Sequence, residues 1–391
     1  MTPVKKKICA ELSGLEHPTL QPPYGGAIIR TFIAKGHDRP VSSERILITG
    51  NEAAGKAAIL AGCRFYFGYP ITPQNELTAY MARHMPEAGG TFIQAESELA
   101  AINMCFGASA TGQRAMTSSG SPGISLKQEG ISYCACAELP VVVVNVMRGG
   151  PGLGNIEPSQ GDYFQATRGG GHGDYRTITL APASVEEFAS FVMEAFDLAD
   201  LYRTPVLVLA DGQLGQMMEP ARFTPPPPRD LPEKDWTLTG AANGREKRII
   251  RSLFLKAGVL TEHVKKLQEK YAVIREREPR CEERDCEEAD VLLVAYGTSA
   301  RIGMEAMRQS TGVRLGLIRP LTLWPFPEKT VRKWTERGKK FLVVEMSAGQ
   351  MVEDVRLAVE GRAPIAFVGR PAGGAPPTSE ILETASALAR G

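Results

Sequence analysis

The seven cysteines of this chain include no C-x-x-C pair, and that absence excludes several classes of site. An odd number of cysteines without that spacing argues against a disulfide framework, a zinc site or a self-contained iron–sulfur cluster. We expect reduced thiols, most of them buried. The cysteines are Cys9, Cys63, Cys105, Cys134, Cys136, Cys281 and Cys286.

A charge surplus and long hydrophobic runs are missing as well. The chain carries 45 Lys and Arg against 44 Asp and Glu, so no global field attracts nucleic acid or an anionic membrane. The most apolar run, around Leu139 to Val144, is far shorter than the roughly 20 residues that cross a bilayer. No signal-peptide core follows Lys5 to Lys7. The sequence predicts a cytoplasmic protein with no nucleic acid and no membrane among its partners.

The composition is that of an ordinary globular protein, and 391 residues suffice for two to three domains at about 150 residues each. Residues 1–42 are rich in proline and glycine and are expected to form an irregular N-terminal arm. Residues 43–218 alternate apolar strands with amphipathic helices, which indicates parallel βαβ units in one complete α/β domain. Its seven expected strands are 46–50, 64–69, 92–95, 115–119, 141–147, 177–180 and 206–211.

The second half divides at a proline run. Residues 219–288 begin with the linker around Pro225 to Pro228 and continue into a helix that ends near Glu278, before Pro279. Residues 289–391 repeat the strand–helix alternation and are expected to form a smaller α/β domain.

Two glycine-containing motifs suggest nucleotide binding but do not fit it. Gly50 to Ala57 matches G-x-x-x-x-G-K, yet Ala57 lacks the hydroxyl that binds magnesium and Glu52 would repel phosphate. A plain strand-to-helix turn with a solvated Lys56 is the better interpretation. The loops 149–154 and 169–173 lack G-x-G-x-x-G spacing, so we expect their glycines to let backbone approach a ligand or another chain closely.

Polar side chains follow several expected strands where those strands end. Thr72 lies between Pro70 and Pro73, Glu98 opens a helix of small residues, and Arg148 opens a glycine loop. In an open α/β sheet, ligands bind at the carboxyl ends of the strands. Each residue also has a structural explanation: Thr72 as a helix cap, Glu98 as a first-turn acid, and Arg148 as a surface charge.

The order of these motifs resembles that of a known family. YPITP (69–73), ESELAAINM (96–104), MTSSGSPGISLKQE (116–129), VVNVMRGGPGLG (143–154) and GGGHGDY (169–175) are similar to motifs of the α subunit of 2-oxoacid:ferredoxin oxidoreductases. The resemblance covers about residues 45–391. It is strongest to the 3-methyl-2-oxobutanoate, or branched-chain, type, with the 2-oxoglutarate type next.

The resemblance implies a fold and a set of site residues. The first domain would be the pyrimidine-binding, parallel-sheet module of a thiamine diphosphate enzyme, and the second would be similar to a transketolase C-terminal domain. Glu98 would be catalytic, because the cofactor needs a carboxyl group on its aminopyrimidine nitrogen. Gly107 stands nine residues after Glu98, as the family pattern requires, whereas Cys105 stands nine after Glu96.

The same resemblance assigns the remaining site residues. Pro70, Ser119 and Gly120 would join Glu98 in binding the cofactor, and Thr72 and Arg148 would bind the substrate carboxylate. The G-D-G motif that holds magnesium and diphosphate is absent, since Ala210-Asp211-Gly212 is the nearest match. No metal ligand is therefore assigned to this chain.

What the chain lacks is expected on partner subunits. A β subunit would carry Mg²⁺ and the diphosphate half of the thiamine diphosphate site, and iron–sulfur clusters would also lie on partners. Gamma and small ferredoxin-like subunits are further expected partners.

The implied reaction is oxidative decarboxylation, in which a 2-oxoacid, coenzyme A and oxidised ferredoxin give acyl-coenzyme A, carbon dioxide and reduced ferredoxin. The 2-oxoglutarate branch of the family tends to carry a GGPST-type loop, so the resemblance of GGPGLGN (149–155) favours a branched-chain substrate. A 2-oxoglutarate enzyme and a non-catalytic assembly subunit are the alternatives.

Overall fold

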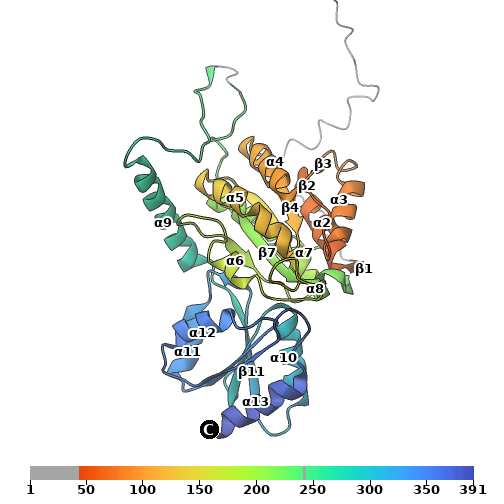
Figure 1. The fold of residues 1–391 in the computed structure, drawn as a ribbon, viewed down its shortest axis with the longest axis vertical. Coiled ribbons are helices and arrows are strands. Elements are labelled where there is room, and N and C mark those ends of the chain that lie inside the picture. The colour runs from red at the N-terminus through yellow and green to blue at the C-terminus, as the bar shows by residue number, and fades with distance from the viewer. Residues whose placement is uncertain (1–43, 241–243) are drawn as a thin grey trace, which may run out of the picture. The chain divides into compact units, whose positions relative to one another are not determined.

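The computed structural model describes residues 44–240 and 244–391. The expected N-terminal arm, 1–42, and Cys9 lie outside the described residues. Strands and helices alternate along most of the chain, in line with the α/β expectation (Figure 1). The first portion contains β1(Ile46–Thr49), α2(Gly50–Leu60), β2(Phe65–Gly68), α3(Asn75–His84), β3(Thr91–Gln94), α4(Glu98–Ala110), β4(Ala115–Ser119), α5(Ser121–Cys136), β5(Val141–Met147), α6(Tyr163–Thr167), β6(Ile178–Leu180), α7(Val185–Tyr202), β7(Val206–Asp211), α8(Gly212–Gln216) and β8(Met218–Ala221).

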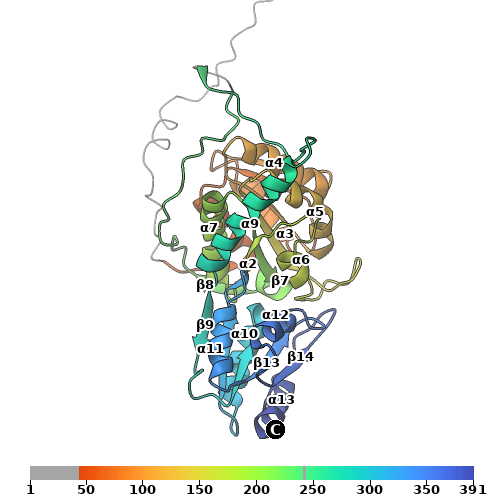
Figure 2. The same ribbon diagram turned by 90° about the vertical axis from the view of Figure 1, so that its left-hand side faces the viewer.

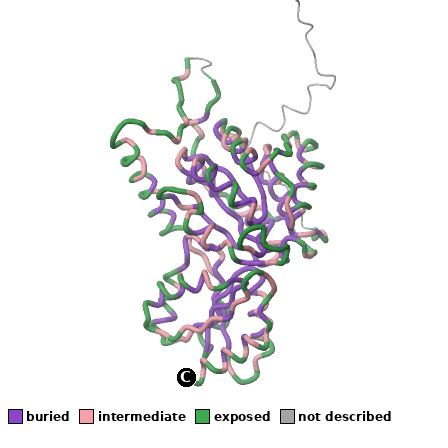
Figure 3. Tube along the Cα trace, viewed as in Figure 1, coloured by how far each residue is buried: buried purple, intermediate pink, exposed green. Residues whose placement is uncertain are grey.

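A seven-stranded sheet in the order β12-β6-β7-β5-β4-β2-β3 forms the centre of the first portion. The six strands from β6 to β3 in that order run parallel. All seven residues of β5 are buried, because parallel strands are covered by helices on both faces. Figure 3 shows this concentration of buried residues along the strands. Within the helical layers that cover the sheet, α4 packs against α5, and α2 packs against α3 and α7.

The membership of this sheet differs from the prediction. Residues 46–49 form β1 as expected, but β1 pairs antiparallel with β8 in a separate two-stranded sheet. The seventh place in the large sheet belongs to β12(Thr322–Trp324), which pairs antiparallel with β6. A three-residue strand shows no periodicity, so it could not be recognised from the sequence.

The connector contains both expected parts and a short strand at each end, β8 and β9. The helix α9(Val259–Arg277) has Glu278 as its C-cap, where Pro279 was expected to stop it. Figure 2 shows α9 beside the first portion, where Lys270 donates to the Glu138 carboxylate at 3.1 Å and to the Arg203 carbonyl at 3.0 Å. Residues Cys281–Arg284 then form β9, a strand that sequence analysis did not predict.

The C-terminal portion has a five-stranded sheet in the order β14-β13-β10-β11-β9, in which β9 alone is antiparallel. Its elements are β10(Val291–Val294), α10(Gly297–Gln309), β11(Leu315–Pro320), α11(Glu328–Glu336), β13(Lys340–Glu345), α12(Met351–Val359), β14(Ile365–Gly369) and α13(Thr378–Arg390). Within the two described ranges, every helix is too short or too polar to span a bilayer.

Candidate active site

The turn after β2 is held by buried polar side chains. Gln74 is fully buried, and its Oε1 accepts from Ser118 Oγ at 2.6 Å and from Thr78 Oγ1 at 3.1 Å. The Tyr66 hydroxyl lies 2.6 Å from Ser118 Oγ and closes this network. Asn51, at the start of α2, donates to the carbonyl of Pro73 at 2.8 Å. The YPITP turn is therefore fixed from two directions. Gln74, Ser118, Tyr66 and Asn51 were not among the predicted residues.

Glu98 is buried where α4 begins. Ser97 caps the helix by accepting from the amide of Ala100 at 3.1 Å, and Glu98 follows as the first helical residue. The side chain of Glu98 is 5% exposed, whereas Glu96 is exposed. Glutamate is almost never buried without a partner, so the buried Glu98 is the stronger candidate of the two for a functional carboxyl group.

The close approach of α5 shapes the space around Glu98. A methyl group at Gly123 would lie 2.4 Å from Glu98 Oε1 and 2.0 Å from Ser119 Oγ, so only glycine leaves these two groups in place. Ser119 Oγ is buried and has no hydrogen-bond partner within the described part of the chain. An unpaired buried hydroxyl beside a buried carboxylate is costly unless a ligand supplies the missing partners.

Arg148, at the end of β5, is also buried, with 7% of its surface exposed. Its Nη1 donates to the carbonyl of Thr72 at 3.0 Å and its Nη2 to the carbonyl of Leu153 at 2.8 Å. Ser121 Oγ, in the first turn of α5, accepts from the Arg148 amide at 3.0 Å. Among the described residues, Arg148 Nε has no partner. The guanidinium thus keeps unused donors for an anion.

The other predicted residues divide into two groups. Gly120 lies with Thr72, since a methyl group at Gly120 would be 3.1 Å from the Thr72 carbonyl. Thr72 Oγ1 accepts from Asn75 Nδ2 at 3.4 Å. Pro70 is exposed in the same turn. The ends of β2, β3, β4 and β5 therefore bring together Thr72 with Gly120 and Arg148, and Glu98 with Ser119.

Asp211, the aspartate of the Ala-Asp-Gly sequence, is used inside the protein. Its carboxylate accepts from the Leu214 amide at 3.0 Å and from Thr298 Oγ1 at 2.8 Å. Burial raises the pKa of Asp211, and these hydrogen bonds oppose the increase. The carboxylate caps α8 and joins it to α10, so it has a structural role in this chain.

The two glycine motifs prove to be packing contacts. A methyl group at Gly50 would lie 2.1 Å from the Leu214 carbonyl, so the strand-to-helix turn faces α8 and leaves no phosphate cradle. Lys56 is half-buried, with its amine 5.0 Å from the centre of the Phe223 ring. The prediction that this side chain is simply solvated is therefore wrong. In the loop 149–154, a methyl group at Gly149 would lie 2.5 Å from the Ala372 carbonyl. This loop approaches another segment of the same chain.

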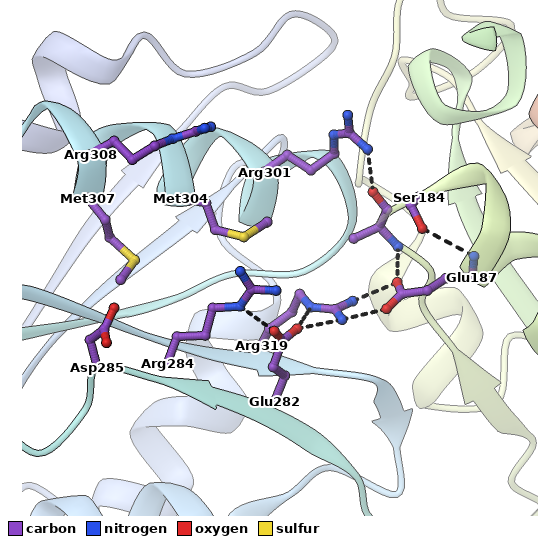
Figure 4. Close-up of a pocket in the computed structure, with 11 residues that line it drawn as sticks. Ser184, Glu187, Glu282, Arg284, Asp285, Arg301, Met304, Met307, Arg308 and Arg319 are labelled. Atoms are coloured by element: carbon purple, nitrogen blue, oxygen red, sulfur yellow. Dashed lines mark hydrogen bonds and ion pairs between the residues drawn. The ribbon is translucent and has the colours of Figure 1, made fainter. Parts of the chain in front are cut away.

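A cavity of about 530 Å³ lies elsewhere, between the start of α7 and the elements α10, β9 and β11 (Figure 4). Each arginine that lines it is paired with a carboxylate; Arg319, for example, donates to Glu187 at 2.6 Å and to Glu282 at 2.7 Å. Paired arginines have little affinity left for an anion. This cavity therefore offers no alternative to the strand-end site.

Comparison with known proteins identifies the family. Residues 56–282, more than half of the chain, match the family model "Pyruvate flavodoxin/ferredoxin oxidoreductase, thiamine diP-bdg", and residues 289–381 match "Pyruvate:ferredoxin oxidoreductase core domain II". The ketoisovalerate oxidoreductase subunit VorB of Methanothermobacter thermautotrophicus is 49% identical over 86% of this chain and 96% of its own length. The chain belongs to the 2-oxoacid:ferredoxin oxidoreductase family.

Other members of this family are also similar. The 2-oxoglutarate synthase subunit KorA of Archaeoglobus fulgidus is 41% identical over 80% of this chain and 91% of its own length. The solved 2-oxoglutarate:ferredoxin oxidoreductase of Magnetococcus marinus superposes with a TM-score of 0.77 at 28% identity, over 88% of this chain. This chain spans 65% of that solved chain. A split-gene transketolase, at a TM-score of 0.51 and 12% identity over 88% of this chain and 98% of its own, shares the fold.

The predicted family, fold class and enzyme type are thereby confirmed. The chain is an α-type subunit of a 2-oxoacid:ferredoxin oxidoreductase, with a parallel-sheet domain followed by a second α/β domain.

Proposed function

We propose that this chain supplies the pyrimidine half of a thiamine diphosphate site, in a complex that oxidatively decarboxylates a branched-chain 2-oxoacid. The observation that carries this proposal is the buried Glu98 carboxyl group, held at the strand ends beside Ser119 and across from Gly123. Pro70 and Gly120 complete the proposed cofactor-binding set.

The residues present fit the aminopyrimidine of that cofactor. Glu98 offers a carboxyl oxygen and Ser119 offers a buried hydroxyl without a partner among the described residues, and Gly123, which has no side chain, lets both groups lie against α5. When bound, thiamine diphosphate supplies the nucleophilic carbon and the electron sink for decarboxylation. Glu98 holds and returns a proton at its carboxyl oxygen, and burial of the carboxyl group keeps water from exchanging that proton.

Arg148 and Thr72 are proposed to orient the substrate carboxylate. The guanidinium is fixed by two backbone carbonyls, so its free donors point in a set direction without further ordering. Decarboxylation disperses the negative charge of the carboxylate, and tight binding of that charge would stabilise the ground state. These contacts therefore serve orientation first.

The substrate class rests on the relatives and on the loop after Arg148. A relative named for ketoisovalerate is 49% identical, and one named for 2-oxoglutarate is 41% identical. Leu153 and Ile156, in the loop after Arg148, are exposed apolar side chains suited to a branched alkyl group. Steady-state rates of the purified complex on 3-methyl-2-oxobutanoate, 2-oxoglutarate and pyruvate test this choice. Preference for 2-oxoglutarate would select the alternative.

The site is proposed to be completed by a β subunit that carries Mg²⁺ and binds the diphosphate. Large apolar side chains adjoin the site residues in sequence yet are exposed: Tyr69 beside Pro70, Leu99 beside Glu98, and Leu126 in the second turn of α5. Exposed apolar groups of this size next to a site support a protein interface there. Iron–sulfur clusters, gamma and ferredoxin-like subunits, and ferredoxin itself are assigned to the rest of the complex, and coenzyme A is the proposed co-substrate.

A non-catalytic assembly subunit is the competing function. The two functions are separated by measuring thiamine diphosphate binding to the assembled complex with and without Glu98→Ala. If this chain only assists assembly, the complex should bind the cofactor equally well in both forms. The six cysteines in the described ranges are free, and reduced thiols support the cytoplasm as the proposed compartment.

A further inference from the structure

Lys127 is the most deeply buried cationic side chain near the candidate site, with 0% of its surface exposed. Lysine is almost never fully buried unless it is paired. Its amine can donate three hydrogen bonds, yet among the described residues it makes one, to the backbone carbonyl of Glu98 at 3.4 Å. A charge in this position needs an explanation beyond packing.

The position of Lys127 follows from how α4 and α5 pack. Gly123 and Gly130 lie four residues before and three residues after Lys127, so all three share one face of α5. That face meets α4, because methyl groups at Gly123 and Gly130 would lie 2.4 Å from Glu98 Oε1 and from Ile102 Cγ2. The lysine therefore enters the helix interface between two close contacts, and its amine reaches the start of α4.

The Lys127 amine has one candidate partner of opposite charge. The titratable side chains that interact with Lys127 are Cys105 and Glu98, both from α4. Burial raises the pKa of the Cys105 thiol well above its ordinary value, so this thiol is neutral near pH 7. Burial lowers the pKa of Lys127 to about 8, and Cys105 and Glu98 act in the opposite direction. Among the described residues, Glu98 is the one carboxyl group whose charge favours the protonated form of Lys127.

We propose that Lys127 is a positioning residue for Glu98: it fixes the start of α4 through the Glu98 carbonyl, and its positive charge attracts the Glu98 carboxyl group in a water-poor site. This role rests on the proposed function of Glu98. It goes beyond that function because it assigns control of the proton to a residue behind the site. A low dielectric makes such a charge effective at short range.

The first test is the pH dependence of kcat/KM in the assembled complex. Lys127→Met keeps the length of the side chain and removes the charge, and Lys127→Gln also keeps a donor for the Glu98 carbonyl. Both variants should move the acid limb of the profile to higher pH by about one pH unit or more. Lys270→Met is the matched control, a largely buried lysine on α9 that pairs with Glu138 and leaves Lys266 to serve that carboxylate.

The second test needs no turnover and uses the cofactor-free complex. In the wild-type background, Lys127→Met removes the cost of burial and also the attraction of Glu98. In a Glu98→Gln background that attraction is already gone. Lys127→Met should therefore raise the midpoint of thermal unfolding by several degrees more in this background than in the wild type. Lys270→Met should change the midpoint equally in both backgrounds.

The outcomes separate this proposal from the proposed function. An unchanged acid limb together with equal midpoint changes in both backgrounds overturns the role of Lys127, even where Glu98→Gln abolishes turnover. Full turnover in Glu98→Gln instead removes Glu98 from the mechanism. Failure of both Lys127 variants to assemble would make the lysine a structural residue and overturn the proposal.

Discussion

Arg148 Nη1 donates to the backbone carbonyl of Thr72 at 3.0 Å, over the end of β4, which lies between β5 and β2 in the sheet. Two residues far apart in the chain thus meet at one edge of the sheet. The contact uses the carbonyl of Thr72, whereas its hydroxyl oxygen accepts from Asn75 Nδ2 at 3.4 Å and keeps its own proton to donate. This separation allows the two side chains to be tested independently.

Arg148→Ala should raise KM for every 2-oxoacid tested by about 10- to 100-fold, since a charge-assisted contact contributes roughly 1.5–3 kcal/mol. Thr72→Val keeps the carbonyl and removes the hydroxyl, so KM should rise only a few-fold, as for a neutral contact of about 0.5–1.5 kcal/mol. Steady-state kinetics on the assembled complex measures both. An unchanged KM in a folded Arg148→Ala complex would reduce Arg148 to a support for the glycine loop.

Glu98→Gln should lower turnover by roughly 10²- to 10⁴-fold, the contribution typical of a general acid–base group, with little change in substrate affinity. The amide preserves the size of the side chain but cannot take up the proton. Glu96→Gln is the control, because Glu96 is exposed two residues earlier. Loss of turnover in Glu96→Gln with an active Glu98→Gln would reverse the assignment.

The sequence predicted where strands form better than it predicted which strands pair. Runs such as 141–147 identify a buried parallel strand, because continuous β-branched residues suit a sheet covered on both faces. The pairing of β1 with β8, and of β12 with β6, joins segments distant in the chain through backbone hydrogen bonds, which carry no side-chain pattern. Sequence analysis also missed α13, although Ile381 and Ala385 recur at helical spacing and are buried.

The candidate site, like the fold, could be predicted only in part. Motif order indicated which strand ends carry Thr72, Glu98 and Arg148, because local signals mark where strands stop. The contact of Gly123 with Glu98 depends on the distance between two helices, and the burial of Lys127 depends on what covers its face of α5. Neither follows from one sequence, since both are set by packing across the helix interface.

Gln160→Leu should destabilise the protein by at least about 2 kcal/mol. Gln160 is fully buried; its Nε2 donates to the Tyr296 carbonyl at 2.9 Å, and its Oε1 accepts from Ser299 Oγ at 2.7 Å and from the Met346 amide at 2.9 Å. Leucine would leave the buried Ser299 hydroxyl and Met346 amide unpaired, whereas the Tyr296 carbonyl keeps its bond from the Ala300 amide. Thermal unfolding measures the loss, with the exposed Gln309→Leu as control. A small change in the midpoint would show that these groups find other partners.

Lys127→Met should stabilise the cofactor-free complex at neutral pH, and the gain should shrink as the pH rises. The pKa of Lys127 falls from 10.5 to about 8 on burial, so below pH 8 folded and unfolded states both bind the proton and the cost of burial is complete. Between these two values the unfolded state binds more protons, and the wild type gains stability. The unfolding midpoints of the wild type and of Lys127→Met should therefore converge as the pH rises through that range. A constant difference between them would contradict the lowered pKa of Lys127.

Gly123→Ala should remove activity while the fold survives. The added methyl group would lie 2.0 Å from Ser119 Oγ and 2.4 Å from Glu98 Oε1. Both contacts are to side-chain ends, which can rotate away, so the helix pair need not separate. Alanine also suits a helix better than glycine by up to about 1 kcal/mol, which offsets part of the strain.

The displaced Glu98 carboxyl group can no longer meet the proposed cofactor, so affinity for thiamine diphosphate and turnover should fall together in Gly123→Ala. Gly130→Ala is the contrasting variant, because its methyl group would lie 2.4 Å from Ile102 Cγ2 in the packed interface of α4 and α5 and should lower the unfolding midpoint. Isothermal titration with the cofactor and thermal unfolding of each assembled variant distinguish the two effects. Normal cofactor affinity in Gly123→Ala would mean that Ser119 and Glu98 do not bind the pyrimidine from the positions they occupy here.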